Sequence, residues 1–395
     1  MSMPSATILP DPLEAAETYA AVLAGRSIEI ERNRFLPQDL ADLSARLGLH
    51  RLCIPAVYGG HEAHPLVLVD VVERLARVDG SAAWCVFIGA TSGMTSGFLA
   101  ADEARAIFGD PMTIVAGVFA PRGQAVRAVE GGVPGYRVSG RWQWGSGSRN
   151  ARWIMGGALT PGDDGKPEMT PEGIPQNRMM IFPADQVTML DTWDVSGLAG
   201  TGSTDFEVKD VFVPASRAVS LISDKPLPLP LYCFPTFGLL GIGIAGVALG
   251  LARGAIDELV ALAGGKTPQG SSKPLATRAK AQIDVSEAEA LVRSARAFLD
   301  VAVNAAWDAA SRDGAITIGH RRDIRLATTH AVRSAARAVD LMYTLAGGSS
   351  VYRSSALQRH FRDVHVATQH MMVSEATYEL TGRLFLGMPT NTAML

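Results

Sequence analysis

An uncharged run of 22 residues, "LYCFPTFGLLGIGIAGVALGLA" at 231–252, restricts the folding of this chain more than any other feature. A run of this length can span a bilayer, so it must be buried either in a membrane or in a protein core. Pro235 and the five glycines inside the run lower its helical propensity, and no second span accompanies it. We therefore expect a buried, tightly packed helix and not a membrane span.

The same run contains Gly241-x-Gly243-x-x-Gly246, which matches the fingerprint of dinucleotide-binding proteins. That fingerprint requires a preceding strand, a tight turn and an acidic residue about 20 residues further on. Here the glycines lie inside a continuous apolar run. Small residues at spacings of three and four let another helix approach closely, so we expect helix packing and no nicotinamide site.

Composition places the chain among ordinary soluble globular proteins. Of its 395 residues 47% are hydrophobic and 19% charged, and the formal net charge is −3, which implies neither nucleic acid nor an anionic membrane as a partner. The three cysteines, Cys53, Cys85 and Cys233, lie far apart without a CxxC motif. This pattern favours buried thiols in a reducing cytoplasm over disulfides or a zinc site, and the N-terminal sequence resembles no secretory signal.

The hydrophobic pattern changes twice along the chain. Apolar residues recur every three to four positions at first, then short β-branched and aromatic runs follow, and finally long Ala-rich amphipathic patterns return. We expect an α+β protein with an N-terminal helical domain at 1–111, a central β domain at 112–218 and a C-terminal helical bundle at 219–395. The Gly- and Pro-rich stretch 160–177 is interpreted as an excursion of the β domain.

Four segments lie in a characteristic order. They are "LGLHRLCIPAVYGG" at 47–60, "YRVSGRWQWGSG" at 136–147, "DVFVP" at 210–214 and "AGGSSVYRSSALQRHFRDVH" at 346–365. In this order and spacing they resemble the acyl-CoA dehydrogenase superfamily over essentially the full length. The resemblance implies an N-terminal helical domain, a central β-barrel or sheet domain and a C-terminal four-helix bundle. It also implies a homotetramer that assembles through this bundle.

Two departures from the dehydrogenases point to another reaction. A dehydrogenase needs a carboxylate that removes the proton alpha to a thioester carbonyl. The position that holds this glutamate in the commonest branch is Met371 here, and the other known position falls near Leu240, with no Asp or Glu between Asp224 and Asp257. The Gly-Ser-Asp flavin loop is missing as well. Both departures resemble the oxygenase components of two-component flavin monooxygenases, which hydroxylate phenols, indoles, polyketides or thiophenes.

The resemblance implies a reduced-flavin-dependent monooxygenase with an aromatic or heteroaromatic substrate. A separate NAD(P)H-dependent reductase would supply FADH2 or FMNH2, O2 would add at flavin C4a, and the hydroperoxide would transfer its distal oxygen to the ring. FAD and FMN both remain open, because the diphosphate-binding Arg-x-x-Phe of the dehydrogenases is not evident. Two rivals are an acyl-CoA dehydrogenase with a relocated base and a non-catalytic flavin- or acyl-CoA-binding protein.

Flavin contacts carried over from the resemblance fall on two segments. Trp144 would flank the isoalloxazine, and Ser146 would offer its hydroxyl to flavin N5 or O4, with Gly147 and Ser148 nearby. The alternative for Trp144 is the core of the β domain. The second segment would face the pyrimidine side or the substrate, with a plain turn as its alternative, and consists of Gly200, Thr201, Gly202 and Ser203.

His365 and His370 stand five residues apart in "RDVHVATQHMMV" at 362–373. If 359–373 is one helix, His360, His365 and His370 are each rotated by about 140° and cannot converge on a metal, so we expect no metal site. Arg362 and His370 would then share a face.

His370 would hydrogen-bond the peroxide or deprotonate the substrate, and a core histidine is the alternative. Arg362 and Asp363 would form an ion pair at the helix junction, or contact the flavin or a subunit. An apolar lining that keeps water from the site is expected from Phe87, Phe237, Leu240 and Met371.

Overall fold

The computed structural model describes residues 9–162, 166–169, 175–393 and 395. Six helices precede the sheet in this part of the chain, and two of them begin at an aspartate that accepts hydrogen bonds from the first turn. Asp11 caps α1 and Asp79 caps α5, which satisfies backbone N–H groups that have no partner inside the helix. These helices are α1 (Pro12–Leu23), α2 (Ser27–Asn33), α3 (Gln38–Arg46), α4 (Pro65–Ala76), α5 (Gly80–Ser92) and α6 (Ala101–Phe108).

The central part forms one mixed sheet with the strand order β5-β6-β2-β1-β3-β4-β7. All neighbouring strands are antiparallel except β1 and β3, which are parallel. The buried indole of Trp142 stacks on Phe206 at 5.2 Å between ring centroids and fills the core of this sheet. The strands are β1 (Val115–Glu130), β2 (Val133–Trp142), β3 (Trp153–Leu159), β4 (Asn177–Pro183), β5 (Thr188–Leu190), β6 (Asp205–Pro214) and β7 (Ala218–Val219).

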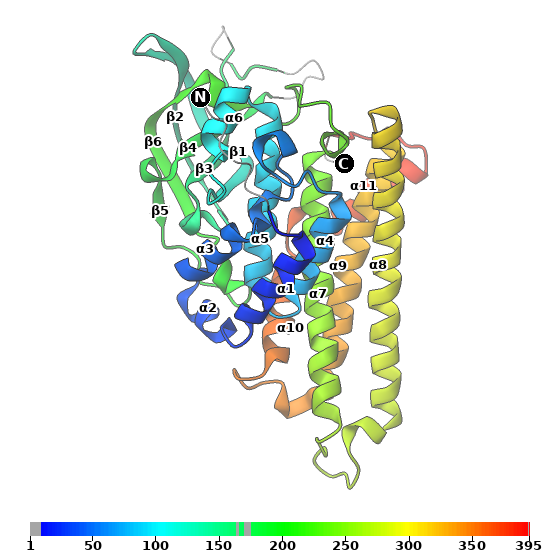
Figure 1. Cartoon of the computed structure of the whole chain (residues 1–395). Helices are drawn as coiled ribbons and strands as arrows, with labels where there is room; N and C mark the ends of the chain where they lie inside the picture. The colour runs from blue at the N-terminus through cyan, green and yellow to red at the C-terminus, as the bar shows by residue number, and fades with distance from the viewer. Residues whose placement is uncertain (1–8, 163–165, 170–174, 394) are drawn as a thin grey trace.

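The C-terminal part is a helical bundle in which α9 packs against both α7 and α8, and α10 packs against α7 and α9. Its helices are α7 (Thr236–Ala263), α8 (Ala279–Asp313), α9 (Ile318–Ala346), α10 (Ala356–Ala367) and α11 (Ala376–Phe385). Figure 1 shows the sheet on one side of the molecule, the long bundle helices on the other, and α5 between them. The predicted fold class is confirmed. Of the predicted excursion at 160–177, residues 163–165 and 170–174 lie outside the described residues.

Residues 236–252 of the uncharged run lie in α7, and 89% of the most apolar stretch of this helix is buried inside the molecule, so the expected buried helix is confirmed. Its glycines allow α4 to pack directly against it. A Cβ atom on Gly246 would lie 2.4 Å from the Val72 side chain, and one on Gly250 would lie 2.3 Å from the Glu73 carbonyl oxygen. Within the described chain, α7 is the one helix long and apolar enough to cross a membrane.

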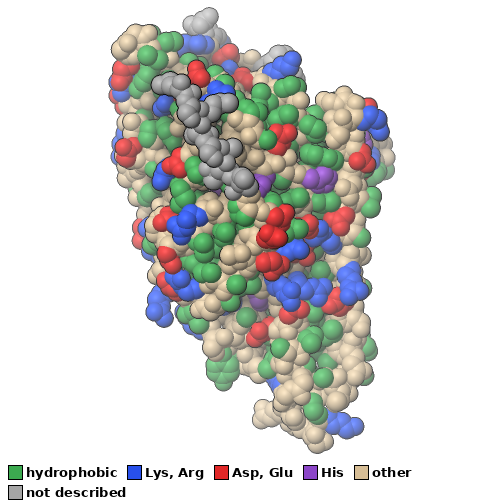
Figure 2. Space-filling model, in the orientation of Figure 1, with side chains coloured by type: hydrophobic (Ala, Val, Ile, Leu, Met, Phe, Trp, Pro, Cys, Tyr) green, Lys and Arg blue, Asp and Glu red, His purple; other side chains and the backbone are tan. Residues whose placement is uncertain are grey.

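The predicted domain boundaries stay a prediction, and the hydrophobic clusters of the chain extend across them. α6 ends at Phe108 and β1 begins at Val115, on either side of the predicted boundary. Helices α1, α4 and α5 share one hydrophobic cluster with the bundle, whereas the two clusters of the sheet also include Ala45 of α3 and Ile107 of α6. Most of the N-terminal helices therefore pack with the bundle as one body, and α3 and α6 pack against the sheet as well. On the viewed face, acidic and basic side chains are interspersed (Figure 2).

Candidate active site

The turn after β2 places an exposed tryptophan beside a buried serine. Trp144 has a φ of 68° and is 68% exposed, whereas Ser146 is buried. A tryptophan in the left-handed region is strained and persists only where its surroundings hold it. Backbone bonds from Gly145 N to Thr204 O (3.0 Å) and from Gly147 N to Thr201 O (2.9 Å) hold the turn. The alternative that placed Trp144 in the β-domain core is wrong, because Trp142 fills that core instead.

Four buried side chains form a continuous hydrogen-bonded chain at this turn, which we call the hydroxyl relay. Trp84 Nε1 donates to Ser146 Oγ at 3.1 Å, Ser146 Oγ and Ser203 Oγ are 2.6 Å apart, and Ser203 Oγ and Thr201 Oγ1 are 2.7 Å apart. Thr201 Oγ1 donates to the carbonyl of Leu198 at 2.8 Å. The structure thus brings together Ser146, Thr201 and Ser203, which the sequence assigned to one site from two distant segments.

The direction of every bond in the hydroxyl relay follows from its two ends. An indole N–H can only donate and a carbonyl oxygen can only accept. Because Thr201 gives its proton to Leu198, Ser203 must give its own to Thr201, and Ser146 must give its own to Ser203. Ser146 therefore has no proton left and retains one free lone pair, so it can accept a hydrogen bond from a ligand but cannot donate one.

The C-terminal helix junction holds the loop that carries Thr201 and Ser203. The Asp363 carboxylate accepts a 2.6 Å bond from Leu198 N, and burial raises the pKa of Asp363 to about 7. Arg362 bonds to the carbonyl of Ser196, to Glu31 at 2.8 Å and to Gln358 at 2.8 Å. Arg362 therefore has three partners within the chain, and Glu31, not the expected Asp363, is its ion-pair partner; a contact of Arg362 with the flavin or a subunit stays a prediction.

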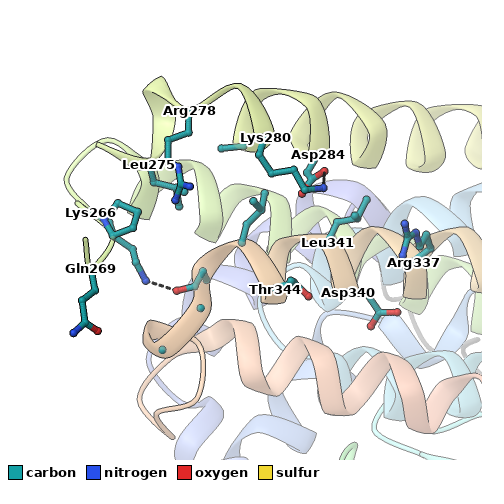
Figure 3. A pocket seen from close by; sticks show the side chains of 16 residues that line it. Lys266, Gln269, Leu275, Arg278, Lys280, Asp284, Arg337, Asp340, Leu341 and Thr344 are labelled. Carbon is teal, nitrogen blue, oxygen red and sulfur yellow. Dashed lines mark hydrogen bonds and ion pairs between the residues drawn. The ribbon is translucent and has the colours of Figure 1, made fainter. Parts of the chain in front are cut away.

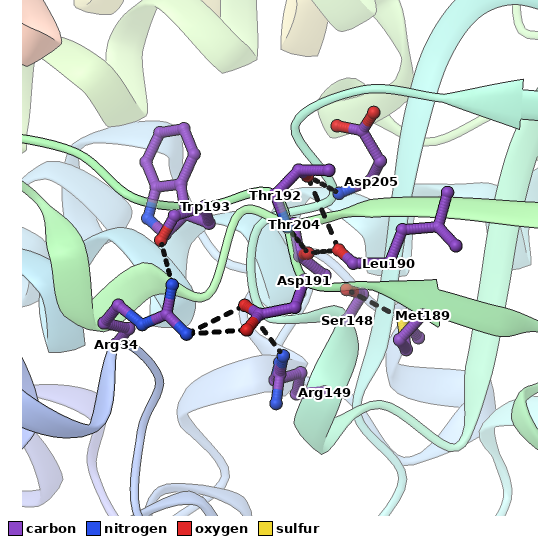
Figure 4. A network of polar contacts seen from close by, with 10 residues as sticks. All are labelled: Arg34, Ser148, Arg149, Met189, Leu190, Asp191, Thr192, Trp193, Thr204 and Asp205. Carbon is purple, nitrogen blue, oxygen red and sulfur yellow. Dashed lines mark hydrogen bonds and ion pairs between the residues drawn. The ribbon is translucent and has the colours of Figure 1, made fainter.

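A second network fixes the other end of this loop (Figure 4). Arg34 binds both oxygens of Asp191, at 2.8 and 2.9 Å, and Thr204 Oγ1 donates to the carbonyl of Leu190. The Ser148 hydroxyl points inward to the sulfur of Met189 at 3.6 Å. Anchored at both ends, the loop presents Thr201 and Ser203 to Ser146 in one arrangement.

The predicted glycines of the site occupy positions where a side chain would be strained or would clash. Gly147 and Gly202 have φ values of 71° and 56°, which an L side chain adopts only with strain. A Cβ atom on Gly200 would lie 2.2 Å from the side chain of Ile30, so α2 closes over this point of the loop. Each of these glycines therefore permits the local path of the chain.

His370 does not lie on a continuous helix. α10 ends at Ala367, and His370 precedes a short 3₁₀ turn at Met371–Val373, so the assumption of one helix over 359–373 is wrong and His370 shares no helical face with Arg362. His370 caps this 3₁₀ turn, because its Nδ1 accepts a 3.2 Å bond from Met372 N.

The same bond fixes the protonation state of His370. Burial, with the positive charge of Arg325, lowers the pKa of His370 to about 4, so the ring is neutral at pH 7. Because Nδ1 accepts a hydrogen bond, the proton of the neutral ring is on Nε2. His370 is thus a neutral hydrogen-bond donor, and its lone pair at Nδ1 is occupied. A pKa this low disfavours the role of general base that deprotonates the substrate.

Trp84 on α5 connects the serine and the histidine, and the sequence analysis missed it. Its ring centroid lies 6.0 Å from that of His370 and 4.9 Å from that of Phe87, while its N–H binds Ser146. Every residue around Trp84 on α5 is apolar or small, so the pattern indicated only a core helix. A buried indole N–H, which needs an acceptor, was the one available signal.

The expected pocket lining is only partly buried. Phe87 is fully buried and packs against Gly243 of α7, and Phe237 lies 4.8 Å from Phe119 between ring centroids. Leu240 is half-buried, but Met371 is 62% exposed. In a single chain Met371 therefore does not line an enclosed cavity, because the turn that begins at His370 directs it outward.

His365 serves the fold and not the site. Its Nε2 lies 2.8 Å from Asp340 Oδ1 on α9, and its ring packs against Phe361. Among the described residues no group of three His, Cys, Asp or Glu side chains could hold a metal ion.

A hollow of about 600 Å³ lies at one end of the bundle (Figure 3). It is lined by Lys266 and Arg278 from the connection between α7 and α8, by Arg337 of α9, and by the carboxylates Asp284 and Asp340. Lys266 is fixed by Ser349 at 2.7 Å. None of the predicted site residues lines this hollow, so it is distinct from the hydroxyl relay and His370.

Comparison with known proteins identifies the class. Family models described as "Acyl-CoA dehydrogenase, N-terminal domain" and "Acyl-CoA dehydrogenase, C-terminal domain" match residues 14–103 and 242–375. Indole-3-acetate monooxygenase of Pseudomonas putida is 33% identical over 95% of each chain. The crystal structure of 3-HSA hydroxylase from Rhodococcus sp. RHA1 superposes with a TM-score of 0.88 at 25% identity, covering 98% of this chain and 99% of that one.

A second solved structure, XiaF from a Streptomyces species in complex with FADH2 and glycerol, has a TM-score of 0.86 at 27% identity. It covers 96% of this chain and 95% of that one. The fold is thus that of the acyl-CoA dehydrogenases. Within that superfamily, the chain belongs to the family of flavin-dependent monooxygenases.

Proposed function

We propose that this protein is a reduced-flavin-dependent monooxygenase that hydroxylates an aromatic or heteroaromatic ring. One observation carries the proposal: within the hydroxyl relay Ser146 keeps a free lone pair that can accept, and a neutral donor, His370, lies beside the same Trp84 ring that binds Ser146. The relatives named as indole-3-acetate monooxygenase and 3-HSA hydroxylase support the reaction class.

The residues present fit a reduced flavin. In reduced flavin N5 carries a hydrogen and can donate, whereas in oxidised flavin N5 can only accept. Ser146 retains a lone pair and no proton, so it would hold the reduced form, and the exposed indole of Trp144 would cover a flat ring. We take FADH2 as the flavin, supported by the complex of XiaF with FADH2.

Bound flavin would supply the activation of O2, and this chain's residues would supply orientation. His370 Nε2–H would donate a hydrogen bond where negative charge develops during oxygen transfer, a role that a neutral imidazole fulfils at any pH well above about 4. Phe87 and Phe237, both buried, would exclude water from the reacting atoms.

A separate NAD(P)H-dependent reductase would supply the reduced flavin, since the glycine run of α7 is a packing surface and not a nicotinamide site. The free thiols Cys53, Cys85 and Cys233 are consistent with the reducing cytoplasm.

The protein would act as a homotetramer. On the bundle helices several apolar side chains remain exposed in the single chain, among them Ile283 and Val301 of α8 and Phe385 and Leu386 at the end of α11. Exposed apolar patches of this kind mark contact surfaces. A measured mass of one chain at micromolar concentration would refute the tetramer.

The function is tested by incubating the protein with enzymatically reduced FAD, O2 and a panel of phenols, indoles and sulfur heterocycles. We expect a product that carries one atom of oxygen from 18O2. The rival acyl-CoA dehydrogenase is tested in the same protein without oxygen, with acyl-CoA and an artificial electron acceptor. Formation of an enoyl-CoA there, without any oxygenated ring product, would overturn the proposal.

A further inference from the structure

A buried arginine next to His370 has no anionic partner in the described chain. Arg325 of α9 is 3% exposed. Its Nη1 contacts the sulfur of Met372 at 3.3 Å and its Nη2 contacts Thr377 Oγ1 at 3.3 Å, while Nε has no hydrogen-bond partner. A guanidinium has five N–H donors, and the acceptors here are one thioether and one hydroxyl, both weak. Leaving such a charge buried and unpaired is costly.

The other arginines of α9 all have carboxylate or backbone carbonyl partners. Arg322 binds Asp323 at 2.8 Å, Arg333 lies 3.5 Å from Glu375, and Arg337 lies 3.5 Å from Glu287. Arg321 donates to two backbone carbonyls of the C-terminal segment. Within the described residues Arg325 is thus the one arginine of α9 with neither a carboxylate nor a carbonyl partner.

The surroundings of Arg325 point toward the active site. Met372, which touches Arg325, donates its N–H to His370 Nδ1, so the arginine and the histidine lie on either side of one residue. One helical turn further along α9, Thr329 is fully buried and its hydroxyl also has no partner among the described residues. A cation and a hydroxyl, both buried and both unsatisfied, therefore stand on one face of α9 beside the donor of the site.

We propose that Arg325 binds the carboxylate of the substrate, and that this enzyme acts on an aromatic acid whose ring lies by His370 and whose acid group pairs with the guanidinium. The inference rests on the proposed function for the ring and deepens it by naming the charge of the substrate. A planar carboxylate matches the guanidinium fork and would occupy the N–H donors that Met372 and Thr377 leave free.

The test compares acids with their neutral amides, beginning with indole-3-acetate and indole-3-acetamide and extending to phenylacetate and its amide. Affinities are measured by calorimetry with reduced FAD and without oxygen, so that hydroxylation is not required. We expect wild-type protein to bind at least one acid about 10²-fold more tightly than its amide, as for a buried charge pair. If no acid binds wild-type protein better than its amide, the inference is overturned.

Arg325→Met should abolish this preference while leaving amide binding unchanged, and Arg325→Lys should retain part of it. Without ligand, Arg325→Met should melt at the same or a higher temperature, because an apolar side chain replaces an unpaired buried charge. A lowered melting temperature together with an unchanged acid preference would show that Arg325 is structural and refute the inference. Arg322→Met, on the same helix but paired with Asp323, is the matched control and should keep the preference.

Failure of the two proposals can be told apart. If the acid preference depends on Arg325 but no ring is hydroxylated, the anion site stands and the proposed reaction is wrong. If neutral phenols and indoles are hydroxylated as readily as the acids, the reaction stands and Arg325 is not a substrate contact.

Discussion

Two polar regions flank Trp84 and His370, and they differ in how many of their polar groups have hydrogen-bond or ion-pair partners. In the hydroxyl relay each proton has an acceptor, from the Trp84 N–H to the Leu198 carbonyl. Around Arg325 a full charge is buried against a sulfur and one hydroxyl. A satisfied network holds one arrangement, whereas an unsatisfied cation is stabilised only when a ligand arrives. The first region is thus organised before binding, and the second is completed by binding.

The comparison also explains the state of His370, which lies between the two regions. Burial, with a smaller contribution from the positive charge of Arg325, lowers the pKa of His370 and keeps the imidazole neutral, and the Met372 N–H directs its proton to Nε2. An anionic ligand at Arg325 would offset the contribution of that charge. The two regions would then be coupled through His370.

The largest expected effect concerns this donor. His370→Leu should lower hydroxylation by about 10² to 10³-fold, the range for losing one preorganised donor, and release more hydrogen peroxide per reduced flavin consumed. His370→Asn should recover part of the rate, since the amide can donate but cannot act as a base. The measurement is product and peroxide per folded molecule.

Equal losses in both variants would instead support a general base, and unchanged turnover with a lower melting temperature would make His370 a core residue. His365→Asn, which removes the contacts of the His365 ring with Asp340 and Phe361, is the control and should keep full activity.

The next effect would break the direction of the hydroxyl relay. In Thr201→Val, Ser203 loses the hydroxyl that accepts its proton. Ser203 would then donate to Ser146, and Ser146 would direct its own proton toward the ligand. The preference for reduced over oxidised FAD should then fall about 10-fold, as expected when one hydrogen bond of about 1.4 kcal/mol becomes mismatched. Anaerobic titrations of both flavin states measure it. Thr201→Ser keeps the hydroxyl and should keep the preference; an unchanged ratio in Thr201→Val would refute the assigned directions.

A smaller effect is expected from Ser146→Ala. The variant leaves the Trp84 N–H without its acceptor and removes the hydroxyl that meets the flavin, so both the free energy of unfolding and the affinity for reduced FAD should fall by about 1 kcal/mol. Urea denaturation and anaerobic binding measure the two quantities. Ser148→Ala, whose hydroxyl contacts only the Met189 sulfur, should change neither. Flavin affinity equal to that of wild-type protein would show that Ser146 does not meet the ring.

How far the sequence predicted these regions depends on whether their signals are local. Periodicity located the helices, the sheet and the buried α7, because the spacing of apolar residues along the chain indicates which face of an element is buried. The resemblance brought Ser146 and Ser203 into one site from segments far apart. Trp84 and Arg325 were missed, since a tryptophan in an apolar helix and an arginine in an amphipathic one are ordinary there, and only tertiary packing shows which polar atoms lack partners. The end of α10 at Ala367 was also missed, because no glycine or proline follows it in 368–370 to mark a helix end.

The smallest expected effect tests whether Arg325 influences His370 electrostatically. The folded-state pKa of His370 is about 4, below the ordinary value of 6.5, so the unfolded chain binds more protons than the native one between these values. Stability is therefore full above pH 6.5 and falls as the pH drops toward 4. Arg325→Met removes the like charge, so the pKa of His370 should rise toward 6.5 and the acid loss of stability should shrink by less than about 1 kcal/mol at pH 5. Chemical shifts of the His370 ring against pH give the pKa directly. If the His370 pKa is the same with methionine at 325, burial alone depresses it, and the proposed coupling between the two regions is absent.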